Sequence, residues 1–175
     1  MLHITPERRK FKFTFSRFGE TCRGKAVRNR MRTAFFGGTF DPVHRGHLAI
    51  AQAVLDRNMA DRILFVPAPN PPHKTDQVIT PFRHRFSMLS LALENHPGLE
   101  LTDMERRRAG KSYTIDTLEE LSADPERGEI LLLIGADSLC QLHTWKRPHD
   151  LVKSFRIITY PRKGEVPEPA LPRPF

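Results

Sequence analysis

Cysteine is scarce in this sequence of 175 residues, and so are long apolar runs. The two cysteines, Cys22 and Cys140, are far apart along the chain and offer no disulfide framework, which is typical of a reducing compartment such as the cytoplasm. No apolar run approaches the roughly 20 residues that a membrane-spanning helix needs. The composition therefore excludes the disulfide-rich secreted class, predicts no membrane partner and leaves one domain of ordinary size.

An even spread of charge is also missing. Residues 1–30 hold nine Lys or Arg and two Glu and contribute +7 of the net charge of +8, whereas the other 145 residues hold 19 basic and 18 acidic side chains. A surface that binds a nucleic-acid backbone needs clustered positive charge on the folded domain. The distribution therefore argues against a nucleic-acid partner.

Residues 1–30 are interpreted as a basic N-terminal extension, disordered or non-native, that precedes a domain over residues 31–175. Met31 stands directly before the first strong strand pattern, which favours it as the natural start. A disordered basic tail and an organellar targeting peptide are the alternatives. The alternation of Phe11, Phe13 and Phe15 also permits an added strand.

The most informative segment runs from Thr33 to Leu48 and reads TAFFGGTFDPVHRGHL. A short apolar run ends at Gly37 and Gly38, an Asp-Pro pair follows, and helical periodicity then begins, which predicts a strand, a glycine turn and a helix. Adjacent glycines let the backbone adopt positive φ and let a ligand approach main-chain N–H groups. The N-terminus of the helix adds unpaired N–H groups that suit a phosphate.

Two histidines, His44 and His47, lie in the first turn of this helix at i, i+3 spacing. Their side chains leave from one face, beside the glycine turn, where they could contact a bound phosphate. The turn lacks the Gly-Lys-Ser/Thr ending of a Walker A loop. A zinc site that includes Asp41, or two surface histidines beside an ordinary turn, are the alternatives.

The rest of the domain alternates strands with helices. Short apolar runs that predict strands occupy residues 34–36, 63–66, 99–102, 130–134 and 156–160. Helical patterns occupy residues 46–57 and 82–93, a segment ending at Leu121, and residues 151–155. The order implies parallel strands with right-handed crossovers. We therefore predict an α/β fold, a Rossmann-like open parallel sheet of about five strands with helices on both faces.

A proline-rich segment, residues 67–81, follows the strand over residues 63–66 and is predicted to be a surface loop. Loops at the carboxyl ends of strands are where open α/β sheets bind ligands. His73 and Lys74 in this loop could meet an anionic phosphate, or they could belong to a solvated polar loop.

The helix predicted over residues 82–93 carries both apolar and basic side chains. Its helical spacing places four apolar residues on the inward face: Phe82, Phe86, Leu89 and Leu93. We predict that Arg83 and Arg85 are surface charges.

The string GGTFDPVHRGH resembles the signature of nucleotidyltransferases that carry an HxGH motif, and it is most similar to that of nicotinate-nucleotide adenylyltransferases. In that family the strand, loop and helix bind ATP. The resemblance therefore assigns six residues to the ATP site. The residues expected to line the nucleotide are Gly37, Gly38, Thr39 and Phe40, and those expected to contact its phosphates are His44 and His47.

Three further segments carry the resemblance: PPHK, ERRRAGKSYTIDTLEEL and GADSL. The first two belong to the acceptor side in that family, and an aromatic residue near Trp145 stacks on the nicotinate ring. The residues that the resemblance assigns to the acceptor are His73, Lys74, Tyr113, Thr114, Asp116 and Trp145. Gly135 and Asp137 are also assigned to the ATP site, where they are expected to lie at the ribose. Helix capping by Asp116 and packing by Trp145 are the alternatives.

The resemblance covers about residues 31–162 and implies transfer of AMP from ATP to nicotinate mononucleotide, with deamido-NAD and pyrophosphate as products. Mg²⁺ is expected with ATP, and no residue is assigned as a metal ligand. Alternatives are a sister adenylyltransferase that uses nicotinamide mononucleotide or pantetheine phosphate, and a non-catalytic nucleotide-binding domain. The family continues with an ISSTxIR motif that this sequence lacks. We therefore expect an incomplete C-terminal end, and a sheet edge left open at residues 156–160.

Overall fold

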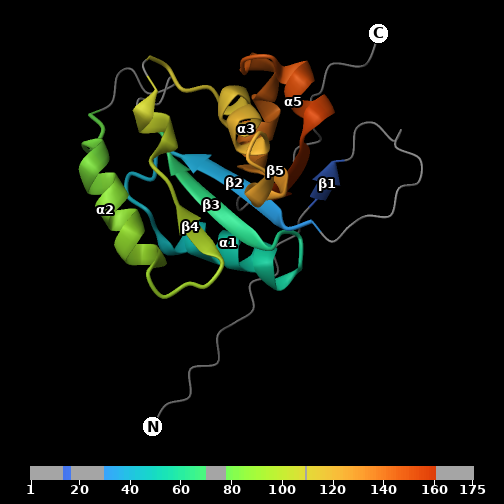
Figure 1. Cartoon of the computed structure of the whole chain (residues 1–175). Helices are drawn as coiled ribbons and strands as arrows, with labels where there is room; N and C mark the ends of the chain where they lie inside the picture. The colour runs from blue at the N-terminus through green and yellow to red at the C-terminus, as the bar shows by residue number, and fades with distance from the viewer. Residues whose placement is uncertain (1–13, 17–29, 70–77, 109, 161–175) are drawn as a thin grey trace.

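A single six-stranded sheet organises the chain (Figure 1). The computed structural model describes residues 14–16, 30–69, 78–108 and 110–160. The sheet has the order β1-β6-β5-β2-β3-β4. Its strands are β1 (Thr14–Ser16), β2 (Arg32–Gly38), β3 (Arg62–Pro67), β4 (Leu99–Leu101), β5 (Glu129–Gly135) and β6 (Arg156–Tyr160). The last five are mutually parallel, which confirms the predicted α/β fold.

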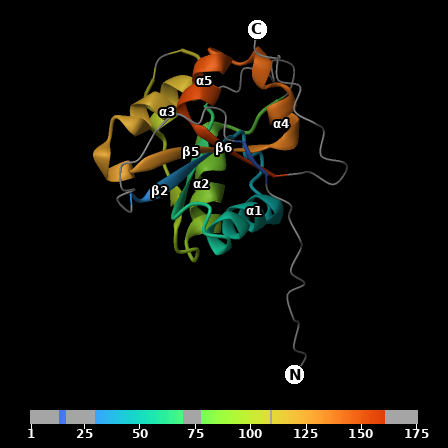
Figure 2. The ribbon, with the colours of Figure 1, turned by 90° about the vertical axis from the view of Figure 1, so that its right-hand side faces the viewer.

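The strands are apolar along most of their length because both faces of the sheet are covered (Figure 2). One face packs against α1 (Arg45–Asp56) and α2 (Phe82–Leu93), and the other packs against α3 (Thr114–Ser122) and α5 (Pro148–Ser154). Neighbouring residues of one strand therefore enter different cores: Phe36 joins the α1 and α2 side, whereas Phe35 joins the α3 and α5 side.

Shorter helical segments complete the connections between these elements. They are α4 (Ala136–Cys140) and the 3₁₀ helices η1 (Met104–Arg107), η2 (Pro125–Arg127) and η3 (Leu142–Thr144). Among the helices of the described residues, none has both the length and the apolar character needed to cross a membrane. Cys140 is a free thiol, and Cys22 lies outside the described residues.

The direction of strand addition reverses between β2 and β5. From β2 the chain adds β3 and β4 on one side, and it then returns to add β5 and β6 on the other. In open α/β sheets such a reversal opens a crevice at the carboxyl ends of the two central strands. The glycines that end β2 and the Gly135 that ends β5 therefore lie at the place where this architecture binds ligands.

Two expectations need correction. The sheet does not stop at β6, because Thr14–Ser16 pairs with it in antiparallel fashion, with Phe15 opposite Ile158. The added strand that the Phe alternation permitted is present in these three residues; the rest of residues 1–29 lies outside the described part. In addition, Arg85 is not a surface charge: its exposed fraction is 1%. It occupies the inward face of α2 with Leu89 and Leu93.

Candidate active site

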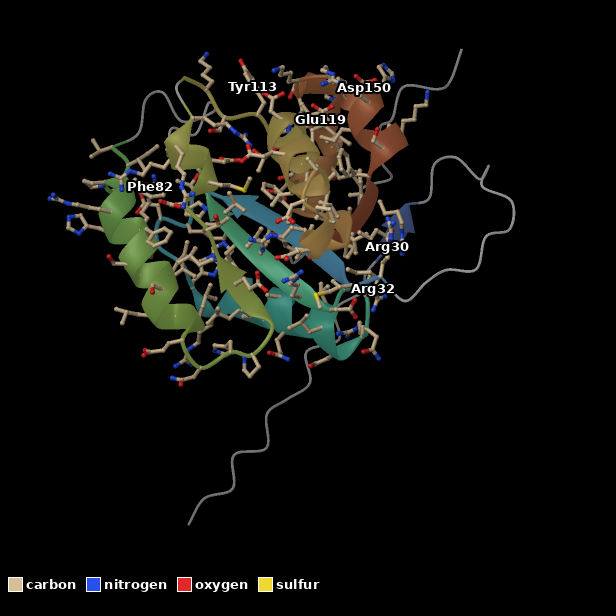
Figure 3. The ribbon with its side chains drawn as sticks, viewed as in Figure 1. Arg30, Arg32, Phe82, Tyr113, Glu119 and Asp150 are labelled. Atoms are coloured by element: carbon tan, nitrogen blue, oxygen red, sulfur yellow. The ribbon has the colours of Figure 1, made fainter. Side chains whose placement is uncertain are left out.

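A cavity of about 380 Å³ lies at the reversal point of the sheet. It is bounded by the end of β2 on one side and by the start of α3 and the segment after η3 on the other. Figure 3 shows Tyr113 at the upper end of the molecule, with Glu119 and Asp150, away from Arg32 at the start of β2. The predicted site residues that line the cavity are Gly37, Gly38, Thr39, Tyr113, Thr114, Gly135 and Trp145.

The glycine turn is shaped by aromatic rings packed behind it. A Cβ added to Gly37 would lie 2.7 Å from the ring of Phe35, and one added to Gly38 would lie 3.1 Å from that of Phe40. Gly37 therefore needs glycine for close packing, and Gly38 has little space for a side chain. Neither glycine has the positive φ that the sequence permitted. Phe40 has a φ of 48°, in the left-handed region, and its buried ring packs on Phe36 with 5.7 Å between ring centroids. Phe40 supports the turn from the core and does not line the cavity.

The two histidines form a stacked pair at the start of α1. Their ring centroids are 3.7 Å apart and their planes differ by 19°. The backbone N–H of His44 donates to Nδ1 of His47 over 3.2 Å. A neutral imidazole that accepts at Nδ1 carries its hydrogen on Nε2, so His47 has the tautomer that donates from Nε2. His47 is half-buried against Phe36 and Phe40, whereas His44 is exposed. Neither histidine lines the cavity.

The opposite wall combines aromatic and charged side chains. Tyr113 and Trp145 line the cavity, and so does Lys146. The ammonium group of Lys146 lies 4.7 Å from the centroid of the Tyr113 ring and 2.9 Å from Oδ2 of Asp116. Asp116 therefore acts on the cavity through Lys146, since it is not itself in the lining.

A buried carboxyl group lies beneath this wall. Glu105 is 5% exposed, lines the cavity and accepts a hydrogen bond from Oγ1 of Thr117 over 2.8 Å. Burial raises the pKa of Glu105, while the Thr117 hydroxyl and the nearby Arg108 guanidinium oppose the rise. Arg108 also donates to Thr117 and pairs with Glu120. The loop before α3 is thereby tied to the first turns of that helix.

At the end of β5, a Cβ added to Gly135 would clash with the carboxylate of Asp137, which folds back over the strand end. Asp137 is exposed in the first turn of α4. It does not line the cavity, but its carboxylate lies against Gly135, which does. The ring of Tyr160, at the end of β6, closes this side and packs against Phe36 with 6.1 Å between centroids.

The remaining predicted residues fall into two groups. His73 and Lys74 lie outside the described residues. Asp41, considered above as a zinc ligand with the two histidines, instead accepts the backbone N–H of Thr80 over 2.8 Å. Over the described part of the chain, no group of three or more His, Cys, Asp or Glu side chains is arranged to hold a metal ion.

Sequence reasoning did not assign Lys146, Glu105, Tyr160 or Arg85 to the site. For Arg85 a signal existed, because its spacing to Leu89 and Leu93 is that of one helical face. Glu105 stands within the ERRRAGKSYTIDTLEEL motif, but its burial depends on contacts made by the folded chain. Nothing local in the sequence indicates that Lys146 faces Tyr113.

Comparison with known proteins agrees with this geometry. Residues 35–174 match the model of the cytidylyltransferase-like family. The chain belongs to that family. It is 43% identical over 133 residues to a protein of Symbiobacterium thermophilum named "Probable nicotinate-nucleotide adenylyltransferase", with 76% of this chain and 64% of the relative aligned. A protein of the same name from Geobacter metallireducens is 40% identical, with 78% and 63% aligned. The chain thus spans less than two thirds of the length of these relatives.

Solved structures of this cytidylyltransferase-like fold extend the comparison. The nicotinic acid mononucleotide adenylyltransferase of Plasmodium falciparum complexed with NaAD has a TM-score of 0.62 at 18% identity, with 77% of each chain covered. The same enzyme complexed with APC has a TM-score of 0.58, also at 18% identity, with 77% of this chain and 76% of that chain covered. At this identity the likeness shows the shared fold.

Proposed function

We propose that this chain supplies the nucleotide-binding and acceptor-binding walls of a nicotinate-nucleotide adenylyltransferase. The stacked histidine pair follows the glycine turn at the start of α1 but does not line the cavity. The observation that carries the proposal is one cavity with two chemically different walls: the glycine turn itself, and an aromatic wall with a lysine. The first suits the phosphates of ATP, and the second suits an aromatic ring with an anionic substituent. The names of the relatives support the same activity.

The proposed reaction is an in-line displacement at the α-phosphorus of ATP. A phosphate oxygen of nicotinate mononucleotide forms the new P–O bond, the bond between the α-phosphorus and the bridging oxygen breaks, and pyrophosphate leaves with that electron pair. The acceptor phosphate is itself the nucleophile, so no activated Ser or Cys is needed. Rate acceleration then comes from alignment of the two substrates and from stabilisation of the charge on the transferring phosphoryl group.

In this mechanism His47 donates from Nε2 to a phosphate oxygen of ATP, beside the main-chain N–H groups of the glycine turn. His44 holds that tautomer through its backbone N–H. Asp137 and Gly135 adjoin the position proposed for the ATP ribose. Mg²⁺ would enter with ATP, because it is bound mostly by substrate phosphates and water, and when bound it would neutralise charge on the leaving pyrophosphate.

The preference for nicotinate over nicotinamide rests on Lys146. Its ammonium group beside Tyr113 and Trp145 favours a carboxylate over a neutral amide on the pyridine ring. His73 and Lys74 remain proposed acceptor contacts, because they lie outside the described residues. A reaction that consumes ATP also fits the cytoplasmic location expected from the cysteine content.

The test is an assay of the full chain with ATP, Mg²⁺ and one acceptor at a time: nicotinate mononucleotide, nicotinamide mononucleotide or pantetheine phosphate. Pyrophosphate release and formation of the dinucleotide are measured together. Product with nicotinate mononucleotide at the highest kcat/KM supports the proposal. A higher kcat/KM with either other acceptor favours a sister adenylyltransferase. Binding of ATP without product from any acceptor favours a nucleotide-binding module.

A further inference from the structure

Arg85 is the bulkiest of the fully buried side chains in the described part of the chain. A buried cation without partners would cost far more free energy than a folded domain can supply. Its surroundings must therefore satisfy a planar guanidinium group that has donors on three nitrogens. Arg85 lies on the first turn of α2, whose N-terminal end is marked by Phe82 in Figure 3.

The partners of Arg85 are carbonyl oxygens from three separate segments. Nη1 donates to the carbonyl of Thr39 in the glycine turn over 2.6 Å. Nε donates to the carbonyl of Thr80, just before α2, over 2.8 Å, and Nη2 donates to that of Pro69, after β3, over 3.3 Å. One side chain therefore joins the turn after β2, the segment after β3 and the start of α2.

Asp41 completes this arrangement from the glycine-turn side. Its carboxylate accepts the backbone N–H of Thr80, whose carbonyl accepts from Arg85. Burial lowers the pKa of Arg85, and the negative charge of Asp41 opposes that effect. Thr80 is thus held from both sides, and the charge of the buried guanidinium is balanced within the same cluster.

The contact with Thr39 bears directly on the cavity, because Thr39 lines it. In a trans peptide the C=O and the following N–H point in opposite directions. Because Arg85 holds the Thr39 carbonyl, it fixes the plane of the peptide that joins Thr39 to Phe40. The N–H of Phe40 in that peptide then points away from the guanidinium. Phe40 has positive φ, a conformation that non-glycine residues adopt at a cost and that needs such support.

We propose that Arg85 is a positioning residue that holds the Gly38–Asp41 turn in the conformation that receives nucleotide phosphates. Arg85 does not line the cavity, so it acts through the main chain of the turn. The inference rests on the proposed function at one point, because the proposed function identifies ATP as the ligand of the turn. The order of the turn itself can be measured without nucleotide.

The first experiment compares Arg85→Lys with the wild-type chain by amide hydrogen exchange, without nucleotide. Lysine keeps the charge but cannot donate to three separated carbonyls at once. Amides of residues 38–41 should exchange about tenfold faster or more, as expected for loss of at least one charge-assisted hydrogen bond. Amides of Leu131–Leu133 in the core of β5 should keep their protection. Unchanged exchange in the turn, or equal acceleration in β5, would overturn the inference.

The second experiment measures ATP affinity through the fluorescence of Trp145, the single tryptophan, which lines the cavity. Arg85→Lys should weaken ATP binding about tenfold. Arg83→Lys is the matched control: Arg83 is exposed on the same helix, contacts His84, and should keep wild-type affinity. In Arg85→Ala, millimolar guanidinium should restore part of the affinity by filling the vacated site.

The two hypotheses fail in different ways. A wild-type chain that does not bind ATP would contradict the proposed function, and the exchange comparison would still decide the role of Arg85. A wild-type chain and an Arg85→Lys variant that bind ATP equally would contradict the inference and leave the proposed function standing. If Arg85→Ala does not fold, the lysine variant alone gives both readouts.

Discussion

The two walls of the cavity are held in place by different forces. The glycine turn rests on buried rings, with Phe40 at 3% exposure, and on main-chain carbonyls bound by the buried Arg85. The facing wall depends on half-exposed ion pairs. In the pair of Lys146 with Asp116, for example, the side chains are 40% and 36% exposed.

This difference has a physical consequence. Contacts between buried groups are little affected by salt, whereas exposed ion pairs contribute little stability and are screened. The turn is therefore rigid before any ligand binds, which suits the proposed role of receiving phosphates, the groups common to all nucleotides. On the proposed function, the exposed side chains of the opposite wall, such as Lys146, should adjust to the acceptor, because separating their ion pairs costs little. Mutations and changes in salt concentration should therefore affect ligand binding at the two walls differently.

The largest effect is expected from His47→Ala, which removes the proposed phosphate donor at the start of α1, next to the glycine turn. Turnover should fall by about two orders of magnitude or more, as for loss of a donor to transition-state charge. The fold should persist, because His47 is only half-buried and α1 keeps its apolar face. The rate of dinucleotide formation measures the first effect, and the thermal melting midpoint measures the second.

His149→Ala is the matched control, because His149 is exposed on α5, which packs on the other face of the sheet from α1. It should retain the wild-type rate. A His47→Ala variant with a near-normal rate, in a form of the chain with measured activity, would remove His47 from the proposed mechanism.

Trp145→Ala acts on the adjustable wall, and its effect should be smaller and restricted to the acceptor. Loss of an aromatic stacking partner should weaken acceptor binding roughly tenfold. ATP affinity should change little. Calorimetric titration with each substrate measures both quantities without tryptophan fluorescence. Trp145→Phe should recover part of the loss, and equal loss for ATP and acceptor would indicate that Trp145 packs the wall without contacting the ring.

The unequal success of sequence-based prediction follows the same division. The glycine turn is one contiguous string, so local rules for glycine, helix starts and strand ends were enough to locate it. Its support by Arg85 was missed because a charged residue in an amphipathic pattern was taken as exposed. The burial of this charge depends on carbonyls from segments far away in sequence.

The facing wall is assembled from α3 and from the segment after η3, which are separated by more than 20 residues. Resemblance assigned Tyr113 and Trp145, but the ion pair between Lys146 and Asp116 depends on how the segment after η3 lies against α3. The pairing of β1 with β6 was equally hidden, because three alternating residues carry too little information to specify a strand.

A third prediction uses the salt dependence of binding to distinguish the two walls. Lys146→Met should weaken binding of nicotinate mononucleotide about three- to tenfold at low ionic strength, the range expected for one half-exposed charge. The difference between variant and wild type should shrink at high salt, because screening removes the contribution of Lys146. Titrations followed by Trp145 fluorescence at both salt concentrations measure this. Lys153→Met, outside the cavity lining, controls for loss of one positive charge.

A gap between variant and wild type that is independent of salt would show that Lys146 contributes by packing on Tyr113 and not by its charge. The wall would then be as rigid as the glycine turn, and the comparison between the two walls would fail.

The smallest effect concerns Glu105, the buried group beneath the adjustable wall. Burial raises the pKa of its carboxyl in the folded chain above the ordinary value, so the folded state holds this proton more tightly than the unfolded state. The contribution of Glu105 to stability is therefore highest at acidic pH. It falls as pH rises from the ordinary pKa to the raised one and is constant above that. Glu105→Gln should remove this fall while its amide oxygen still accepts from Thr117.

The thermal midpoint of Glu105→Gln relative to wild type should therefore rise with pH across that window. The effect should be modest, because the Thr117 hydroxyl and the Arg108 guanidinium already favour the charged form. Glu94→Gln, at an exposed position, controls for the loss of one negative charge. Midpoints that differ by a constant amount at every pH would show that the pKa of Glu105 is the same in the folded and unfolded chains, so that the Thr117 hydroxyl and the Arg108 guanidinium fully offset the effect of burial.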